Sequence, residues 1–130
     1  MTAGKASVFV HPRLKVEGIV NSTLSALVKD FIKYKSGEYI HYFGKDVGYI
    51  RPEPYAERAE LKHLHVLDKV KSIQMRGNTS NAALIYTVAA TRLNTYCIID
   101  FVAEEAHETA RDMKQMREWI AAAESFRDKF

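Results

Sequence analysis

The chain has 130 residues, 47% of them hydrophobic and 27% charged, and its formal net charge is +3 at pH 7. This length fits one compact domain with a sizeable buried core. We therefore expect a single domain over residues 1–130, of which residues 1–6 are disordered. No segment has the length and hydropathy of a transmembrane helix, and the N-terminus lacks the apolar stretch of a signal peptide. These features exclude a membrane-spanning protein, and we expect a cytoplasmic protein that does not associate with membranes.

Several large enzyme classes are excluded by motifs that the sequence lacks. It has no glycine-rich phosphate loop, no nucleophile elbow and no cysteine or cysteine–histidine pairs at zinc-site spacing. Its single cysteine, Cys97, lies in an apolar run, so no intramolecular disulfide can form and a reducing compartment fits best. The modest positive charge makes an anionic partner plausible without identifying it.

The first half of the chain contains one clear helix. Residues 8–10 predict a short strand. Apolar residues at helical spacing then predict a helix that starts at Asn21 or Ser22 and ends near Gly37; they are Leu24, Leu27, Val28, Phe31 and Ile32. Residues 37–60 are rich in Gly, Pro and Tyr and have no clean period, so we expect a long structured loop with one helical turn.

The second half predicts a sheet followed by a helix. Alternation over residues 61–67 predicts a strand that places His63 and His65 on one face. The other expected elements are strands over 70–75, 82–89 and 96–102 and a turn over 77–81. The last helix is expected over residues 106–127, with an apolar stripe of Met116, Trp119, Ile120, Ala123, Phe126 and Phe130. This order predicts an α+β fold, a small antiparallel β-sheet packed by an N-terminal and a C-terminal helix.

The first turns of this last helix are the most suggestive chemical feature. His107 and Arg111 are four residues apart and so share one helical face, and Asp112 follows directly. A helix N-terminus already favours an anion through its free N–H groups and its dipole, so a phosphate would suit this place. From composition alone, the more frequent arrangement is a solvated surface on which Arg111 pairs with Glu104 or Glu108.

His63 and His65 are also candidate metal ligands. Two ligands are too few for a zinc site, and a third would have to come from elsewhere in the fold, such as His107. More commonly, two such histidines line the solvent or cleft face of a half-buried strand. We therefore expect no metal and no other cofactor. Tyr86 lies in an apolar run, and we expect it to pack in the core with its hydroxyl hydrogen-bonded.

Three blocks of sequence recur together in a known family. The first joins residues 30–37 to the run Phe43–Asp46. The second and third contain His63–Val66, Arg76 and Tyr86, then His107–Asp112, Gln115, Met116, Ala123–Arg127 and Phe130. In order and spacing these blocks resemble the YafO family of bacterial toxins, over about residues 24–130. The third block is the most specific, because its spacing from Tyr86 to Phe130 matches without gaps.

The resemblance implies both a function and a fold. Members of this family are toxins of type II toxin–antitoxin systems, which act as ribosome-dependent mRNA endoribonucleases and are held inactive by a cognate antitoxin protein. The expected partners are therefore the antitoxin, the ribosome and mRNA. The implied fold is RelE-like, a small α+β domain with a central antiparallel sheet.

The resemblance also suggests roles for individual residues. In metal-free RNA cleavage the 2′-hydroxyl attacks the adjacent phosphorus, so cations must hold the phosphate and another group must transfer protons. We hypothesise that Arg111 and Arg76 hold the scissile phosphate and that His107 or His65 transfers protons. Asp112 would orient Arg111 or its helix. Contacts to RNA or the ribosome are expected from Lys45, Lys62 and Arg127, and structural support from Tyr86.

The chain departs from the family pattern just before Tyr86. Relatives tend to carry an acidic residue and then a histidine there, whereas this chain has Ser80, Asn81, Ala82 and Ala83. Lys45 also replaces a more usual arginine, and the two side chains are not equivalent at a bidentate phosphate contact. Two alternatives therefore stay open: a catalytically silent relative that binds only ribosome or antitoxin, and an unrelated small RNA-binding domain. Scattered lysines would suit docking on ribosomal RNA; they are Lys29, Lys33, Lys35, Lys62, Lys69 and Lys71.

Overall fold

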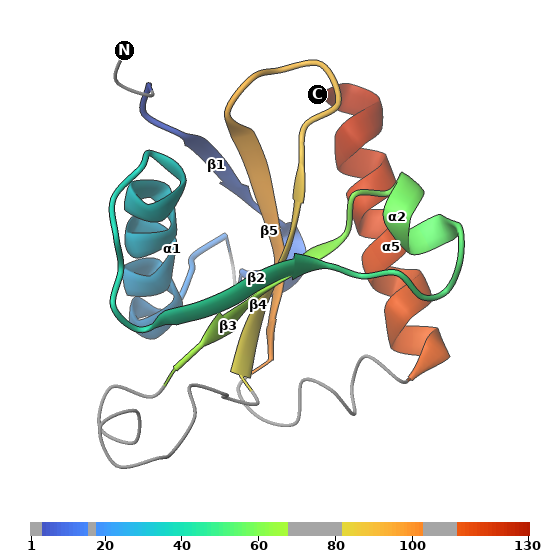
Figure 1. Cartoon of the computed structure of the whole chain (residues 1–130), viewed down its shortest axis with the longest axis horizontal. Helices are drawn as coiled ribbons and strands as arrows, with labels where there is room; N and C mark the ends of the chain where they lie inside the picture. Colours follow the sequence, from blue (N-terminus) through green and yellow to red (C-terminus); the bar gives the residue numbers. More distant parts are fainter. Residues whose placement is uncertain (1–3, 16–17, 68–81, 103–111) are drawn as a thin grey trace.

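The computed structural model describes residues 4–15, 18–67, 82–102 and 112–130 (Figure 1). The first part contains a strand, a 3-10 turn, a helix, a strand and a short helix: β1 (Ser7–Val10), η1 (Pro12–Leu14), α1 (Ser22–Lys35), β2 (Phe43–Gly48) and α2 (Tyr55–Arg58). The second part contains three strands and a long helix: β3 (Lys62–Val66), β4 (Ala82–Val88), β5 (Thr95–Val102) and α5 (Met113–Lys129).

The strands form one five-stranded sheet in the order β1-β5-β4-β3-β2. The three pairings among β2, β3, β4 and β5 are antiparallel, whereas β1 pairs with β5 in parallel. Figure 1 shows α1 on one side of the sheet and α5 with α2 on the other. The predicted α+β class, with a sheet packed by an N-terminal and a C-terminal helix, is confirmed. The sheet is mixed rather than wholly antiparallel, because β1 lies parallel to β5, while α1 connects β1 to β2 at the opposite edge of the sheet.

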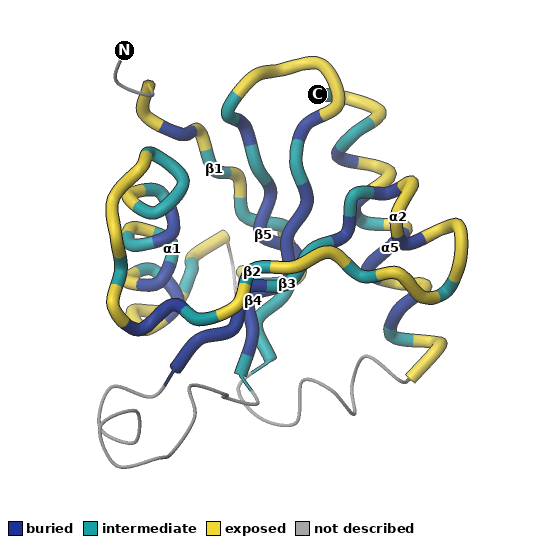
Figure 2. The backbone as a smooth tube through the Cα atoms, viewed as in Figure 1, coloured by how far each residue is buried: buried dark blue, intermediate teal, exposed yellow. Residues whose placement is uncertain are grey.

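Each face of the sheet has its own apolar core, and Figure 2 shows the buried backbone concentrated where strands and helices meet. On the α1 side the strands contribute Leu64, Val66, Leu84, Tyr86 and Ile98. On the α5 side the buried residues include Ile85, Ile99, Met116, Trp119 and Phe126. Alternate residues of a strand point to opposite faces, so β4 and β5 each supply both cores.

Helix α1 forms where its apolar periodicity predicts it. The side chain of Asn21 accepts a hydrogen bond from the backbone N–H of Leu24 at 2.8 Å and so caps the first turn. Gly37 follows the last turn with φ of 106°, a conformation that glycine adopts without steric cost. Leu24, Leu27 and Phe31 are buried against the sheet.

The segment between α1 and β3 contains more structure than its sequence predicts. The helical turn expected in residues 37–60 is present as α2, but the same segment also contains β2, where a loop was expected. β2 is an edge strand with two glycines and few β-branched residues, so its pattern is weak. Its pairing with β3 has a bulge between Phe43 and Asp46, whose partners are Val66 and Leu64.

The C-terminal helix begins later than its sequence predicts. Asp112 has an extended backbone (φ −76°, ψ 107°), and its side chain accepts hydrogen bonds from the backbone N–H groups of Lys114 and Gln115. The prediction that one helix spans 106–127 is therefore wrong at its start, because the chain turns at this cap. The expected strand over 70–75, the turn over 77–81 and the positions of Arg76, His107 and Arg111 lie outside the described residues.

Residues 4–6, expected to be disordered, instead make defined contacts. Ala6 is buried, and its N–H donates to the Ser36 hydroxyl at 2.9 Å. The side-chain amide of Asn94 donates to the carbonyl of Gly4 at 2.7 Å. In the described part of the chain, no helix combines the length and apolar character needed to cross a membrane.

Candidate functional site

A pocket of about 460 Å³ opens on the α1 side of the sheet, at the C-terminal end of α1. Its lining residues come mainly from α1, from strands β2 to β5 and from the last turn of α5. Its charged lining residues are Lys35, Asp46, Glu60, Lys62 and Arg127, and its aromatic ones are Tyr86 and Tyr96. Residues from six elements therefore converge on one concavity.

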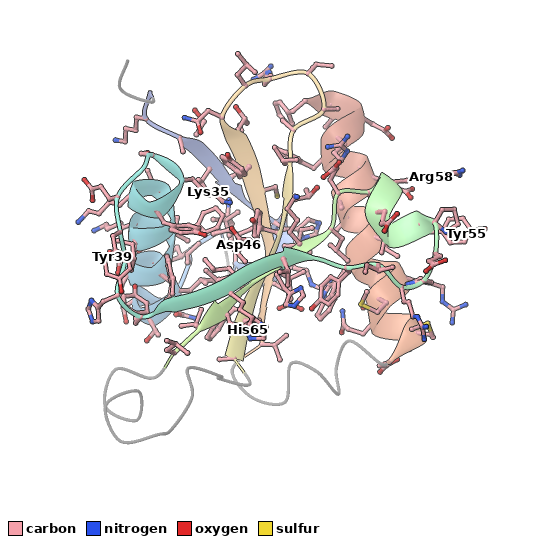
Figure 3. All side chains as sticks on the ribbon, in the orientation of Figure 1. Lys35, Tyr39, Asp46, Tyr55, Arg58 and His65 are labelled. Atoms are coloured by element: carbon pink, nitrogen blue, oxygen red, sulfur yellow. The ribbon has the colours of Figure 1, made fainter. Side chains whose placement is uncertain are left out.

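An ion pair lies at the floor of this pocket. The Nζ of Lys35, the last residue of α1, is 3.0 Å from Oδ2 of Asp46 on β2 and donates at 2.9 Å to the hydroxyl of Tyr86 on β4. Both charged side chains are mostly shielded, with 17% of Lys35 and 19% of Asp46 exposed. Figure 3 shows the two side chains next to each other between α1 and the sheet.

The bulge in β2 explains how Asp46 reaches this position. Two residues of β2 lie between Phe43 and Asp46, where one residue of β3 lies between Val66 and Leu64. The extra residue turns Asp46 onto the same face as Phe43, toward α1, because side chains otherwise alternate along a strand. The sequence Phe43-Gly44-Lys45-Asp46 thus positions the carboxylate.

Three donors surround the Asp46 carboxylate. Besides Lys35, the hydroxyls of Tyr86 and Tyr34 donate to it, at 2.5 and 2.9 Å. Burial favours the neutral acid, but the hydrogen bonds from Tyr86 and Lys35 outweigh it and lower the pKa of Asp46 below its ordinary value. Burial, together with the hydrogen bond to Asp46, raises the pKa of Tyr34 to about 12. At neutral pH the cluster therefore contains an ionised carboxylate and neutral phenols.

Aromatic rings enclose the ammonium of Lys35. Its Nζ lies 4.7 Å from the ring centroid of Tyr86 and 5.2 Å from those of Tyr34 and Tyr96, with Phe31 at 5.8 Å. Cations within about 6 Å of an aromatic face are attracted by its quadrupole. Together with the hydrogen bonds, these rings fix the position of the ammonium.

Two further cations line the pocket. Lys62 pairs in register with Tyr86 on the neighbouring strand, and it contacts the half-exposed Glu60 at 3.5 Å. Arg127 comes from the last turn of α5, and its Nη1 donates to the carbonyl of Val88 at 2.7 Å. This hydrogen bond uses one donor of the guanidinium to hold the side chain. Three cations from three elements thus line the pocket, together with the carboxylates of Asp46 and Glu60, and such cations can bind an anion like phosphate.

Comparisons with known proteins agree with the resemblance seen in the sequence. The family model described as "Toxin YafO, type II toxin-antitoxin system" matches residues 32–128. The chain belongs to the YafO family. It is thus the toxin of a type II toxin–antitoxin system, and this class implies a cognate antitoxin as partner.

One relative of this toxin is the mRNA interferase toxin YafO of Escherichia coli strain K12. The two are 30% identical over 115 residues, which cover 82% of this chain and 87% of the relative. No solved structure matches the toxin at a comparable level of significance.

Of the residues predicted to act in this toxin, the structure brings Lys62, Arg127 and Tyr86 together in the pocket. Lys45 is exposed on β2 beside Asp46 and does not line it. Asp112 is the N-cap of α5. Arg76, His107 and Arg111 lie outside the described residues, so their position relative to the pocket stays a prediction.

His65 lies on the other side of the sheet from the pocket. It shares its strand face with His63, whose ring stacks on Tyr49 at 4.1 Å and contacts the His65 ring at 5.1 Å. That face packs toward α5, since Tyr49 also stacks on Trp119. Only 7% of His65 is exposed. Among the described residues, no group of three potential ligands surrounds this pair.

Sequence reasoning missed Lys35 and Asp46 as parts of the site. Sequence patterns place Lys35 only among the scattered lysines, and they place Asp46 in the expected loop over residues 37–60 with no role of its own. Lys35 and Asp46 are 11 residues apart in the sequence. Tyr86 follows Lys35 by 51 residues and Asp46 by 40 residues, so these contacts are not visible in local sequence. A usable signal was the position of Lys35 at the end of an amphipathic helix, one turn after the buried Phe31.

Proposed function

We propose that this toxin is an endoribonuclease that cleaves mRNA on translating ribosomes in the cytoplasm and so inhibits translation. The observation that carries the proposal is the pocket in which Lys35, Lys62 and Arg127 converge. Such an arrangement suits the phosphate of an RNA backbone. The name of the Escherichia coli relative, an mRNA interferase, points in the same direction.

The proposed reaction needs no covalent intermediate with the protein. The 2′-oxygen loses its proton to a base and forms a bond to the adjacent phosphorus, while the bond from phosphorus to the 5′-oxygen breaks. The 5′-oxygen takes up a proton from an acid. The products are a 2′,3′-cyclic phosphate and a 5′-hydroxyl. Negative charge develops on the phosphate oxygens, so positioned cations provide the main stabilisation.

Lys62 and Arg127 would bind the RNA phosphates in the pocket, with Lys45 adding charge at its outer edge. Arg111 and Arg76 stay proposed ligands of the scissile phosphate on the basis of the family resemblance. For proton transfer the burial of His65 on the opposite face of the sheet favours His107. Asp112 supports the site through the start of α5.

Dependence on the ribosome would account for the small number of catalytic groups. Bound mRNA in the ribosome is already held in a fixed geometry, and orientation of reactants can supply several kcal/mol of a barrier. The toxin would then need to contribute only charge and proton transfer.

A second candidate is a toxin that binds the ribosome without cutting mRNA. The departure at Ser80–Ala83, which removes an acidic residue and a histidine usual in relatives, favours it. Growth arrest without new mRNA ends would support this alternative.

Induced expression followed by mapping of mRNA 5′ ends tests the proposal. We expect new 5′-hydroxyl ends within translated regions for the wild type and a strong loss of these ends for Arg111→Ala. Arg117→Ala, a change of the same type at an exposed position on α5, is the control. Wild-type cleavage by Arg111→Ala would refute the assignment of that residue, and absence of new ends in the wild type would refute the ribonuclease function.

A further inference from the structure

Lys35 is held more firmly than a surface lysine requires. It is bound by Asp46 and Tyr86 and enclosed by four aromatic rings, yet it still lines the pocket. A lysine side chain in solution samples many rotamers, and fixing it in one of them costs conformational entropy. This cost is offset here by contacts from α1, β2, β4 and β5.

The ammonium of Lys35 has an unused donor within the described part of the chain. A lysine carries three N–H groups, and two of them bond to the Asp46 carboxylate and the Tyr86 hydroxyl. The tetrahedral geometry of the nitrogen directs the third N–H away from these two acceptors. Because Lys35 lines the pocket, an anion bound there can accept this hydrogen bond.

Stability alone is a weak reason for such an ion pair. Removing two charges from water is costly, and apolar residues of similar volume often replace a shielded ion pair without loss of stability. The Lys35–Asp46 pair is instead well suited to stabilise charge in a reaction, since donors fixed beforehand need no reorganisation when charge develops.

We propose that Lys35 is a catalytic residue whose third N–H donates to a non-bridging oxygen of the scissile phosphate, and that Asp46 is the positioning residue that holds it there. This inference rests on the proposed ribonuclease function. Lys35 gains and loses no covalent bond in the reaction; it stabilises the charge on the phosphate as the 2′-oxygen attacks. Lys62 and Arg127 then hold the neighbouring phosphates.

Cleavage of a defined mRNA on purified translating ribosomes tests the proposal, using variants in which the charges of Lys35 and Asp46 are removed. The double variant Lys35→Met/Asp46→Asn removes both charges together and leaves no unpaired carboxylate. Lys114→Met, at an exposed lysine on α5 that does not line the pocket, is the control. Lys35→Arg is measured beside them, because its guanidinium keeps Asp46 paired if the double variant proves unstable. Thermal unfolding establishes that each variant is folded.

We expect the double variant to be folded and to cleave about 100-fold more slowly than the wild type, the typical effect of losing one preorganised donor. Lys35→Arg is expected to lose at least about 10-fold, since a planar fork does not reproduce the geometry of an ammonium. Asp46→Asn alone is expected to lower kcat with little change in KM, which a purely structural role would not produce.

Two results would overturn the proposal, and they have different consequences for the ribonuclease function. Wild-type rates for the double variant, or for Lys35→Arg if the double variant unfolds, would show that the pair is only structural and would leave the ribonuclease function intact. Absence of cleavage by the wild type and by Lys114→Met would refute the proposed function and, with it, the role of Lys35.

Discussion

The Asp46 carboxylate is the residue on which the candidate site is organised. Three donors from α1 and β4 converge on it, and each of these hydrogen bonds would weaken if it were protonated. Because Tyr34 and Lys35 join α1 to β2 through this group, its ionisation links the stability of the fold to the geometry of the site.

Acid should therefore weaken the fold through Asp46. Its pKa is raised by burial but lowered further by the hydrogen bonds from Tyr86 and Lys35, so the net shift is downward. A lowered pKa gives stability that is fully present above the pKa of an unfolded aspartate, about 3.9, and is lost as pH falls through the folded value. We expect the stability advantage of the wild type over Asp46→Asn to shrink between about pH 5 and pH 2 in urea unfolding.

Asp128→Asn, at an exposed position on α5, is the control for that measurement. A difference in unfolding free energy between the wild type and Asp46→Asn that stays constant across this range would contradict the role assigned to the carboxylate.

Individual residues show which side-chain positions a local sequence pattern can predict. Alternation in β3 correctly places His63 and His65 on one face, because the side-chain period of a strand is a local property. The same reasoning cannot find the Lys35–Asp46–Tyr86 cluster. Those contacts depend on which strands become neighbours and on one bulge, and neither is encoded in local periodicity.

Among the elements, α1 matters most for the site because its last residue is Lys35. Phe31 is fully buried and contacts Tyr86 edge-on at 5.0 Å, so it anchors the end of the helix on the sheet. We expect Phe31→Ala to lower the free energy of unfolding by about 3–5 kcal/mol in urea titrations, as the loss of a buried aromatic ring usually does.

Tyr39 is the matched aromatic control, since 87% of it is exposed (Figure 3). Tyr39→Ala should change the unfolding free energy by less than about 0.5 kcal/mol. Equal effects of the two substitutions would contradict the assignment of α1 to the core.

The start of α5 offers a test of its cap. Asp112 accepts from two backbone N–H groups at 3.0 and 3.3 Å, so Asp112→Ala is expected to cost about 1 kcal/mol in unfolding free energy. Asparagine caps helices about as well, so Asp112→Asn should retain most of this stability. A loss as large for asparagine as for alanine would show that the charge, not the cap, is what matters.

Elements differ in how well they could be predicted. Helix α1 and strands β3, β4 and β5 have strong patterns, and the structure contains them near the expected bounds. Strand β2 contains two glycines and an aspartate and forms through its edge pairing with β3, so its sequence alone favours a loop. For the C-terminal helix, the sequence predicts a start at residue 106, whereas α5 starts at Met113. The apolar stripe shows which side of the helix is buried but does not show that Asp112 caps its first turn.

For the whole molecule, the proposed binding to ribosomes should be sensitive to salt, since the chain has a formal net charge of +3. Each phosphate contact releases counterions, so the logarithm of the affinity falls linearly with the logarithm of the salt concentration. We expect Lys45→Ala to weaken binding to ribosomes and to reduce this slope by about 1, as measured by sedimentation at several salt concentrations. An unchanged slope would show that Lys45 contacts no phosphate.

We propose that the pocket at the end of α1 is where this toxin acts on mRNA. Purified toxin, translating ribosomes and one defined mRNA allow cleavage to be measured directly for Lys62→Ala/Arg127→Ala beside the exposed pair Lys114→Ala/Arg117→Ala. We predict that the wild type and the exposed-pair variant produce new 5′-hydroxyl ends at equal rates and that the folded pocket variant loses at least about 100-fold. Equal cleavage by all three proteins would contradict the assignment of the pocket.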